Sequence, residues 1–304
     1  MLSTYNPNLH YLKEQIESLL SQDIVEYSYD IIIRDDGSTN VEVLSYLKIL
    51  SEQRSNVIAL FGENMGVFGS FWFLLDYAYK KGYDYVSLSD QDDIALPMKL
   101  SLAIKCLNKE NKAIPILFFS QMIYVNDKLD KQGEPFVNTS VLGFSNALFE
   151  SSVNGNLMVM NRKACELVVS KKPTSFYMHD WWIYICVAAF GKVIFSPTPT
   201  LLYRQHANNV IGGTDSFYDV MRRRIKRFSE YSDKTYPVYK QGMEVMELFG
   251  AQMDKEKRLV LNNLLNSKSS LLKRICYAFS SGNFIRMKTI DTLLLRFLIL
   301  LNKY

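Results

Sequence analysis

The sequence is poor in the features that disulfide frameworks, zinc sites and membrane spans require. Its four cysteines (Cys106, Cys165, Cys186 and Cys276) form no C-x-x-C pair and fall in apolar-patterned segments, so we interpret them as reduced core residues. No run reaches the roughly 18–20 apolar residues that span a bilayer, and residues 1–30 contain no signal-peptide h-region. We therefore expect a globular, cytoplasmic protein.

Charge is distributed unevenly along a chain of otherwise ordinary composition. The 304 residues are 48% hydrophobic and 22% charged. Residues 1–212 hold 18 Lys/Arg against 22 Asp/Glu, whereas residues 213–304 hold 17 against 9. This asymmetry predicts two parts, of which the second favours an anionic surface. The first part is not basic, which argues against a nucleic-acid partner.

Strand-like and helix-like segments alternate in the first half. Short β-rich runs at Tyr29–Arg34, Asn56–Phe61 and Tyr83–Leu88 are separated by segments with helical periodicity, such as Leu9–Leu20. This order predicts a parallel, Rossmann-like α/β layer whose ligands bind beyond the carboxyl ends of the strands. After Ser216 almost everything has a helical pattern.

Polar and acidic turns follow the predicted strands. They are "STYNP" (3–7), "DDGS" (35–38), "ENMG" (63–66) and "DQDD" (90–93). Turns are commonly built from Asp, Asn and Gly, but one turn needs only one carboxylate. Like charges as close in sequence as Asp90, Asp92 and Asp93 repel one another. The cluster therefore predicts a partner cation or a proton, and its oxygens suit Mg²⁺ or Mn²⁺ with a phosphate-bearing substrate.

The chain resembles the inverting glycosyltransferases of family 2, and among them most closely the bacterial rhamnosyltransferases that build surface polysaccharides. The resemblance covers about residues 1–212 and rests on six motifs in order: "STYN", "RDDGS", "ENMGVFGSF", "SLSDQDD", "MHDWW" and "YRQHANNVIG". It implies a GT-A fold, an α/β structure with a mixed sheet flanked by helices. We expect this catalytic domain over residues 1–212 and a basic, amphipathic helical region over 213–304.

The resemblance also implies roles for individual residues. Asp36, Thr4 and Tyr5 match positions that contact the pyrimidine base, and Asp90 matches one near the ribose. Asn64 and Arg204 would complete the nucleotide-sugar site, with Arg204 near the diphosphate. Asp92 and His206 would hold the divalent cation, Mn²⁺ or Mg²⁺, with Asp93 in support. Asp35 is either a solvated turn residue or a direct participant.

Asp180 and its neighbours have two interpretations. The aspartate opens an apolar helix, where a first-turn carboxylate is stabilised by the helix dipole by about 0.3–1 kcal/mol. The resemblance instead makes Asp180 the catalytic base that deprotonates the acceptor hydroxyl. His179 lies beside it in the same motif. Trp181 and Trp182 either line the acceptor site or pack in the core.

The chain departs from the family pattern in two places. Its first strand is short, so either the strand is truncated or the natural start lies upstream, and base binding by Thr4 and Tyr5 is less secure. The Gln-x-x-Arg-Trp motif of processive synthases is absent, which favours addition of one or a few sugars.

Two cationic segments stand out in the second part. "DVMRRRIKRF" (219–228) gathers five basic residues on one predicted helix, and 284–301 has a narrow polar stripe at Arg286, Thr289, Thr292 and Arg296. Such segments bind anionic lipid headgroups. The alternative is a helix packed on the catalytic domain or in a homodimer interface.

Together these features predict transfer of a hexosyl group, L-rhamnose from dTDP-rhamnose, to a growing or lipid-linked bacterial polysaccharide at the inner face of the plasma membrane. A UDP-hexose is an alternative donor because thymine and uracil present the same edge to Asp36. An alternative of another class is a catalytically silent scaffold that binds a nucleotide-sugar or a glycan.

Overall fold

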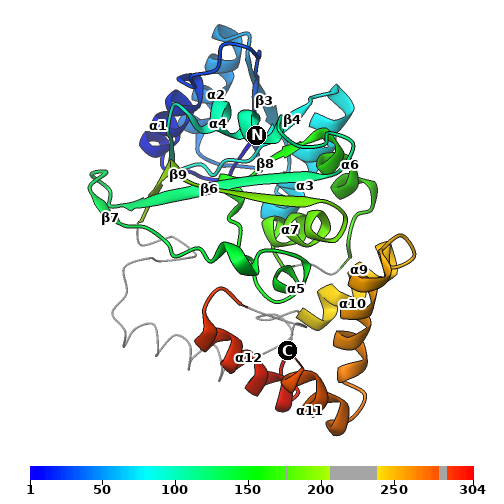
Figure 1. Cartoon of the computed structure of the whole chain (residues 1–304). Helices are drawn as coiled ribbons and strands as arrows, with labels where there is room; N and C mark the ends of the chain where they lie inside the picture. The colour runs from blue at the N-terminus through cyan, green and yellow to red at the C-terminus, as the bar shows by residue number, and fades with distance from the viewer. Residues whose placement is uncertain (175–176, 206–237, 281–285) are drawn as a thin grey trace. The chain divides into compact units, whose positions relative to one another are not determined.

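The fold is that of a computed structural model, which describes residues 1–174, 177–205, 238–280 and 286–304. The chain divides into two compact units (Figure 1). Unit 1 contains residues 1–135, 153–169 and 194–214, and unit 2 contains residues 136–152, 170–193 and 215–304. The expected boundary after residue 212 lies outside the described residues.

Unit 1 begins with a three-stranded parallel sheet in the order β1-β2-β3 (Leu2–Thr4, Ile31–Asp35 and Val57–Phe61). Crossover helices alternate with the strands: α1 (Leu9–Leu20), α2 (Val41–Gln53) and α3 (Gly66–Lys81). The apolar periodicity of Leu9–Leu20 predicts α1 with the bounds observed. Helix α1 begins at a capping residue, Asn8, whose side chain accepts the N–H groups of His10 and Tyr11.

The second sheet of unit 1 runs in the order β4-β8-β6-β9-β5, with β7 paired to β6. Its strands, in chain order, are β4 (Tyr85–Ser87), β5 (Ile94–Ala95), β6 (Ile116–Val125), β7 (Lys131–Gly133), β8 (Val159–Asn161) and β9 (Lys192–Arg204). In Figure 1 the long strands β6 and β9 cross the unit side by side. Helix α4 (Lys99–Leu107) packs on β6 and β8, and α6 (Arg162–Ser170) directly follows β8.

One sequence-based expectation is corrected by this sheet. Among the described residues, β4 pairs antiparallel with β8 and joins the parallel sheet only through an isolated bridge between Leu2 and Ser89, because its hydrogen-bonding partner comes from a distant part of the chain. β9 is a single strand although it contains Pro197 and Pro199. Since β5 pairs only with Leu201 and Leu202, the N–H that each proline lacks is not needed on that side of the strand.

Unit 2 is helical in its described part. It contains α5 (Phe144–Ala147), α7 (His179–Phe190), α9 (Val238–Phe249), α10 (Lys255–Ser267), α11 (Leu271–Phe279) and α12 (Thr289–Leu300), and short 3-10 turns lie at Thr139–Val141 in this unit and at Gly155–Leu157 in unit 1. The four last helices pack in sequence, α9 on α10, α10 on α11 and α11 on α12. Among the described residues, no helix combines the length and the apolarity that crossing a bilayer requires.

Both units have apolar cores. In unit 1, one cluster lies between α1, α2 and the parallel sheet and includes Leu12, Ile33 and Leu47. A second cluster joins α4 to β6 and β8 around Phe118, which is fully buried. In unit 2, Trp182 of α7 is fully buried and packs with Phe249 of α9.

Among the residues of unit 1, we expect truncation of Phe118 to lower the free energy of unfolding most. Phe118→Ala removes a fully buried ring from a packed cluster and should lower the free energy of unfolding by about 3–5 kcal/mol. Urea unfolding followed by far-UV circular dichroism measures it. The matched control Phe136→Ala removes a ring that is 64% exposed and should change stability by less than about 0.5 kcal/mol. Equal losses in the two variants would contradict the assigned core.

Candidate active site

The carboxyl ends of the parallel strands meet at one edge of unit 1. Thr4 of β1 is in register with Asp35 of β2, and Asp35 with Phe61 of β3. The loop after β1 is tied to its neighbours on both sides. The Asn6 N–H donates to Ser38 Oγ (2.8 Å), and the Tyr5 N–H donates to Gln91 Oε1 (3.0 Å). The structure thus brings together the three turns that contain Tyr5, Asp36 and Asp90.

A close backbone approach joins the second turn to the third. Gly37 has a φ of +85°, and a Cβ at this position would lie 2.8 Å from the backbone nitrogen of Asn64. A side chain is therefore excluded here by both conformation and space. The glycine of "DDGS" lets this turn lie against the "ENMG" loop, which places Asp36 near Asn64.

Asp36 is buried and held by several contacts. Its carboxylate pairs with Arg34 and accepts the N–H of Met65 at Oδ1 (3.0 Å), and its own N–H donates to Thr4 O (2.8 Å). The Arg34 guanidinium also donates to Glu63 O (3.0 Å). Arg34 therefore fixes the orientation of Asp36 and ties β2 to the loop after β3.

The side chains of Thr4 and Asp35 stabilise the turn that follows β2. The Thr4 hydroxyl donates to Asp35 Oδ2 (3.3 Å), and the Ser38 N–H donates to Asp35 Oδ1 (2.8 Å). Asp35 is only 2% exposed, so its interpretation as a solvated residue is wrong: the carboxylate is buried because it accepts the N–H group that closes the turn. Tyr5, by contrast, is exposed.

The carboxylate cluster has an exposed and a buried part. Asp90 and Asp92 are partly exposed, whereas Asp93 is 1% exposed. Asp93 Oδ2 accepts Asn156 Nδ2–H (2.6 Å), and Oδ1 accepts the N–H of Arg204 (3.2 Å). Burial raises the pKa of Asp93 well above its ordinary value, the charges of Asp90 and Asp92 raise it further, and the two hydrogen bonds oppose them.

The buried residue Lys99 interacts electrostatically with the cluster. Lys99 Nζ donates to Asn156 O (2.6 Å) and Leu88 O (3.2 Å). Burial lowers the pKa of Lys99 to about 8, while the charges of Asp93 and Asp90 act to raise it. The charge of the lysine therefore interacts favourably with the carboxylates of Asp93 and Asp90.

Arg204 at the end of β9 is 1% exposed and is engaged by the protein through all three guanidinium nitrogens. Nε donates to Asp92 O (3.1 Å), Nη1 to Asp127 O (2.9 Å), and Nη2 to Glu14 Oε2 (2.7 Å). The guanidinium therefore holds the backbone of the "DQDD" turn. Its contact with a diphosphate stays a prediction.

The second acidic motif lies in unit 2, at the start of α7. Asp180 is in the first turn and accepts the Trp181 N–H (2.7 Å). His179 is buried, which lowers its pKa, while the charge of Asp180 acts to raise it. Trp181 and Trp182 are both buried, and Trp181 Nε1–H donates to Ala147 O (2.6 Å). These contacts favour the packing role of the two tryptophans.

The donor atoms near Asp92 fit a hard divalent cation. Asp90 and Asp92 offer partly exposed carboxylate oxygens, which Mg²⁺ and Mn²⁺ prefer. Within the described part of the chain, no group of three His, Cys, Asp or Glu residues stands ready to hold an ion. The other predicted ligand, His206, lies outside the described residues, and its role stays a prediction.

Sequence reasoning missed three residues of this site: Arg34, Lys99 and Asn156. Arg34 gave a usable signal, because a charged residue directly after the apolar run "III" in a buried strand requires a partner. The sequence around Lys99 and Asn156 contains no comparable signal of their roles. Their roles arise from contacts between segments about 60 residues apart.

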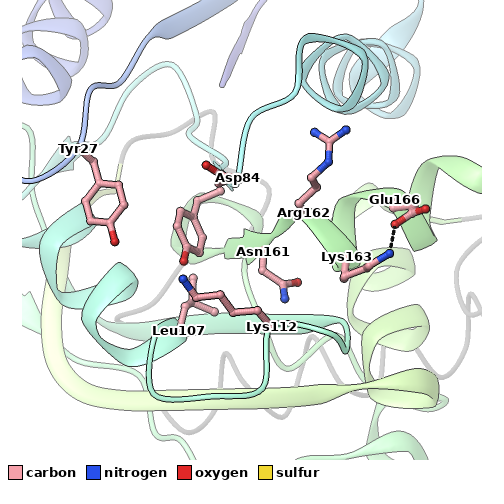
Figure 2. Close-up of a pocket in the computed structure, with 9 residues that line it drawn as sticks. Tyr27, Asp84, Leu107, Lys112, Asn161, Arg162, Lys163 and Glu166 are labelled. Carbon is pink, nitrogen blue, oxygen red and sulfur yellow. Dashed lines mark hydrogen bonds and ion pairs between the residues drawn. The ribbon is translucent and has the colours of Figure 1, made fainter.

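A separate pocket of about 360 Å³ lies elsewhere in unit 1 (Figure 2). Its lining includes Tyr85 at the start of β4 and Arg162 and Lys163 at the start of α6. None of the predicted site residues lines it. The pocket lies at the end of β4 away from Asp90, so it is distinct from the carboxylate cluster.

Two proteins of known sequence resemble the chain over most of its length. The dTDP-rhamnosyl transferase RfbG of Shigella flexneri is 26% identical over 258 residues, which cover 77% of this chain and 80% of RfbG. An uncharacterized glycosyltransferase of Methanocaldococcus jannaschii is 26% identical over 242 residues, which cover 78% of each protein.

Solved structures of S. aureus TarS share the fold. TarS 1–349 matches 99% of this chain and 78% of its own with a TM-score of 0.54, at 14% sequence identity. The same fragment in complex with UDP-GlcNAc matches 100% of this chain and 91% of its own with a TM-score of 0.53, also at 14% identity. The GT-A fold expected from the sequence is confirmed.

The family itself follows from a sequence match. The family model described as glycosyl transferase family 2 matches residues 1–167, more than half of the 304 residues. The match covers the turns that contain Asp36, Asn64 and Asp92. The chain belongs to glycosyl transferase family 2.

Proposed function

We propose that this family 2 glycosyltransferase is an inverting, metal-dependent enzyme that transfers L-rhamnose from dTDP-rhamnose to a growing or lipid-linked bacterial polysaccharide. The observation that carries the proposal is the carboxylate cluster. Asp90 and Asp92 are partly exposed at the edge where the turns converge, above a buried Asp93 that the protein itself holds. Such an arrangement suits a cation that carries a diphosphate.

The donor nucleotide would bind at the turns of unit 1. In this proposal the pyrimidine base contacts Asp36 at Oδ2, since Oδ1 accepts the Met65 N–H, and the exposed Tyr5 and Asn64 flank it. Thr4 positions the turn through Asp35. Asp90 takes the ribose hydroxyls. Asp92 and His206 would hold Mn²⁺ or Mg²⁺, with Asp93 in support.

When bound, the cation would neutralise charge that accumulates on the departing diphosphate. Arg204 would add to this field through its buried guanidinium and would keep the Asp92 backbone in place.

Asp180 would be the catalytic base. It accepts the proton of the acceptor hydroxyl while that oxygen forms a bond to the anomeric carbon. The bond from the anomeric carbon to the diphosphate oxygen breaks, and the nucleoside diphosphate leaves with the bonding electrons. One displacement of this kind inverts the anomeric configuration. His179, buried beside Asp180, would position α7, and the buried tryptophans would keep that helix start rigid.

The donor sugar is proposed from a relative. A protein named dTDP-rhamnosyl transferase covers most of this chain, which supports dTDP-rhamnose. The TarS complex with UDP-GlcNAc supports a UDP-sugar as the alternative. We further propose a cytoplasmic enzyme, peripheral to the inner face of the plasma membrane, where a lipid-linked acceptor is presented.

We expect Asp180→Asn to abolish chemistry and spare binding. With water as acceptor, hydrolysis of dTDP-rhamnose should slow by about 10²–10⁴-fold, because the base is lost. Donor affinity, measured by calorimetry, should be unchanged. Released dTDP is followed by a coupled assay in the presence of Mn²⁺.

The matched control is Glu42→Gln, which neutralises a carboxylate at the same position of another first turn, that of α2. This variant should hydrolyse the donor at the parental rate. Equal rates in parent and Asp180→Asn would instead support a scaffold without catalysis.

Donor choice is tested by comparing four nucleotide-sugars at equal concentration: dTDP-rhamnose, dTDP-glucose, UDP-glucose and UDP-GlcNAc. We expect kcat/KM for dTDP-rhamnose to exceed each of the others by about tenfold or more, because a pocket that fits the sugar discriminates by a few contacts. The dTDP-glucose arm separates recognition of the sugar from recognition of the base. A preference for either UDP-sugar would contradict the rhamnosyl assignment and leave the family unchanged.

A further inference from the structure

The last two helices of unit 2 each present an apolar face to solvent. On α11, Leu272 is 71% exposed and Phe279 is 67% exposed; on α12, Leu293 is 58% and Phe297 51% exposed. The two helices pack against each other. Large apolar side chains gathered in this way on neighbouring helices mark an interaction surface more often than isolated exposed leucines do.

The exposed residues of α12 and its C-terminal end follow helical spacing. They are Ile290, Leu293, Leu294, Phe297 and Leu301. These positions recur every three or four residues and so lie on one side of the helix. The opposite side is buried and contains Thr292, Leu295 and Ile299.

The polar stripe predicted from the sequence therefore lies partly on the inner side of α12. Thr292 Oγ1 accepts the Arg286 N–H (3.0 Å), and the Arg286 guanidinium donates to Glu150 (3.1 Å). Phe284 and the basic segment 219–228 lie outside the described residues. Within the polar stripe Thr292 is buried, whereas Thr289 is exposed together with the apolar residues of the outer side.

The C-terminal residues hold α12 in this orientation. Tyr304 is 1% exposed and shares a hydrogen bond between its hydroxyl and that of Ser267, the last residue of α10. Lys268 Nζ lies 5.0 Å from the centre of the Tyr304 ring. These contacts attach the end of the chain to α10 and so anchor the C-terminal end of α12.

The charge around the two helices selects among the partners that such a face could have. Residues 268–304 contain seven Lys/Arg and one acidic residue, Asp291, and Lys273 and Lys288 are exposed. A second copy of the chain would bring equal positive charges together, which disfavours self-association. An anionic bilayer offers complementary charge and an apolar interior for the leucine and phenylalanine side chains.

The lengths of the helices agree with binding to the surface of a bilayer. α11 has 9 residues and α12 has 12, fewer than the roughly 20 that span the hydrocarbon core. We propose that the exposed apolar faces of α11 and α12 dock on an anionic membrane, with both helices lying in the interface and Lys273 and Lys288 at the headgroups. The proposed docking does not depend on which nucleotide-sugar the enzyme uses. Only the role of docking in bringing the enzyme to a lipid-linked acceptor rests on the proposed function.

Flotation of the full-length protein with vesicles tests this surface. We expect binding to vesicles of phosphatidylglycerol and phosphatidylcholine, and much weaker binding to phosphatidylcholine alone. Phe279→Ser/Phe297→Ser should weaken binding to anionic vesicles by about tenfold or more, because two large apolar side chains no longer insert. Lys273→Gln/Lys288→Gln should weaken it too, and the binding that remains should depend less on salt.

The matched control is Phe136→Ser, which removes an exposed ring of unit 2 that lies outside α11 and α12. This variant should bind vesicles like the parent. Far-UV circular dichroism and donor hydrolysis check that each variant is folded, and flotation needs no activity, so failure of docking and failure of catalysis are distinguishable.

Three results would overturn the proposal: no flotation of the parent, equal binding to both kinds of vesicle, or unchanged flotation of the phenylalanine variant. Sedimentation velocity tests whether the face binds a second copy of the chain instead. A parental dimer that becomes monomeric in Phe279→Ser/Phe297→Ser would assign the face to a second copy of the chain.

Discussion

The candidate site of unit 1 depends on the burial of one carboxylate, Asp93. Its two oxygens accept hydrogen bonds from Asn156 and from the backbone of Arg204, and so join the turn after β4 to the segment before β8 and to the end of β9. A buried charge without such partners would cost several kcal/mol. Because Asp93 is satisfied from within, the partly exposed Asp90 and Asp92 are held where a cation can meet them. The charge of Lys99 interacts favourably with Asp93 and Asp90 and so offsets part of the repulsion within the cluster.

The opposite side of the site follows the same principle. Asp36 is as buried as Asp93, and Arg34 fixes it much as Asn156 fixes Asp93. In both places a buried carboxylate is oriented by a dedicated donor, and the turn that follows is closed by backbone contacts. A pre-ordered site of this kind loses little conformational freedom when the nucleotide binds. In unit 2, Asp180 in the first turn of α7 accepts the N–H of the next residue, Trp181.

The sequence was sufficient for the helices and for the carboxyl-end turns, since both are encoded locally. Periodicity defines α1 with its observed bounds, and strand–turn alternation places Asp36 and Asp90 at one edge. It was insufficient where the determining contact is distant. β4 pairs with β8 some 70 residues later, and neither Lys99 nor Asn156 carries a signal of its role in its neighbours. The apolar side of α12 that remains exposed was likewise not predictable, because only packing on the rest of unit 2 decides which of its two apolar sides is buried. The predicted roles of Asp180, His206 and Arg204 stay predictions.

We expect the carboxylate cluster to bind a cation together with a nucleoside diphosphate. Titration calorimetry of dTDP with and without Mn²⁺, on the parent and on Asp92→Asn, tests it most directly. We expect binding that requires Mn²⁺ in the parent and is lost in the variant. Folding should be unaffected, because Asp92 is partly exposed and Asp93 is left in place. Binding that is independent of Mn²⁺, or equal in both proteins, would contradict it and would mean that the cluster has a structural role.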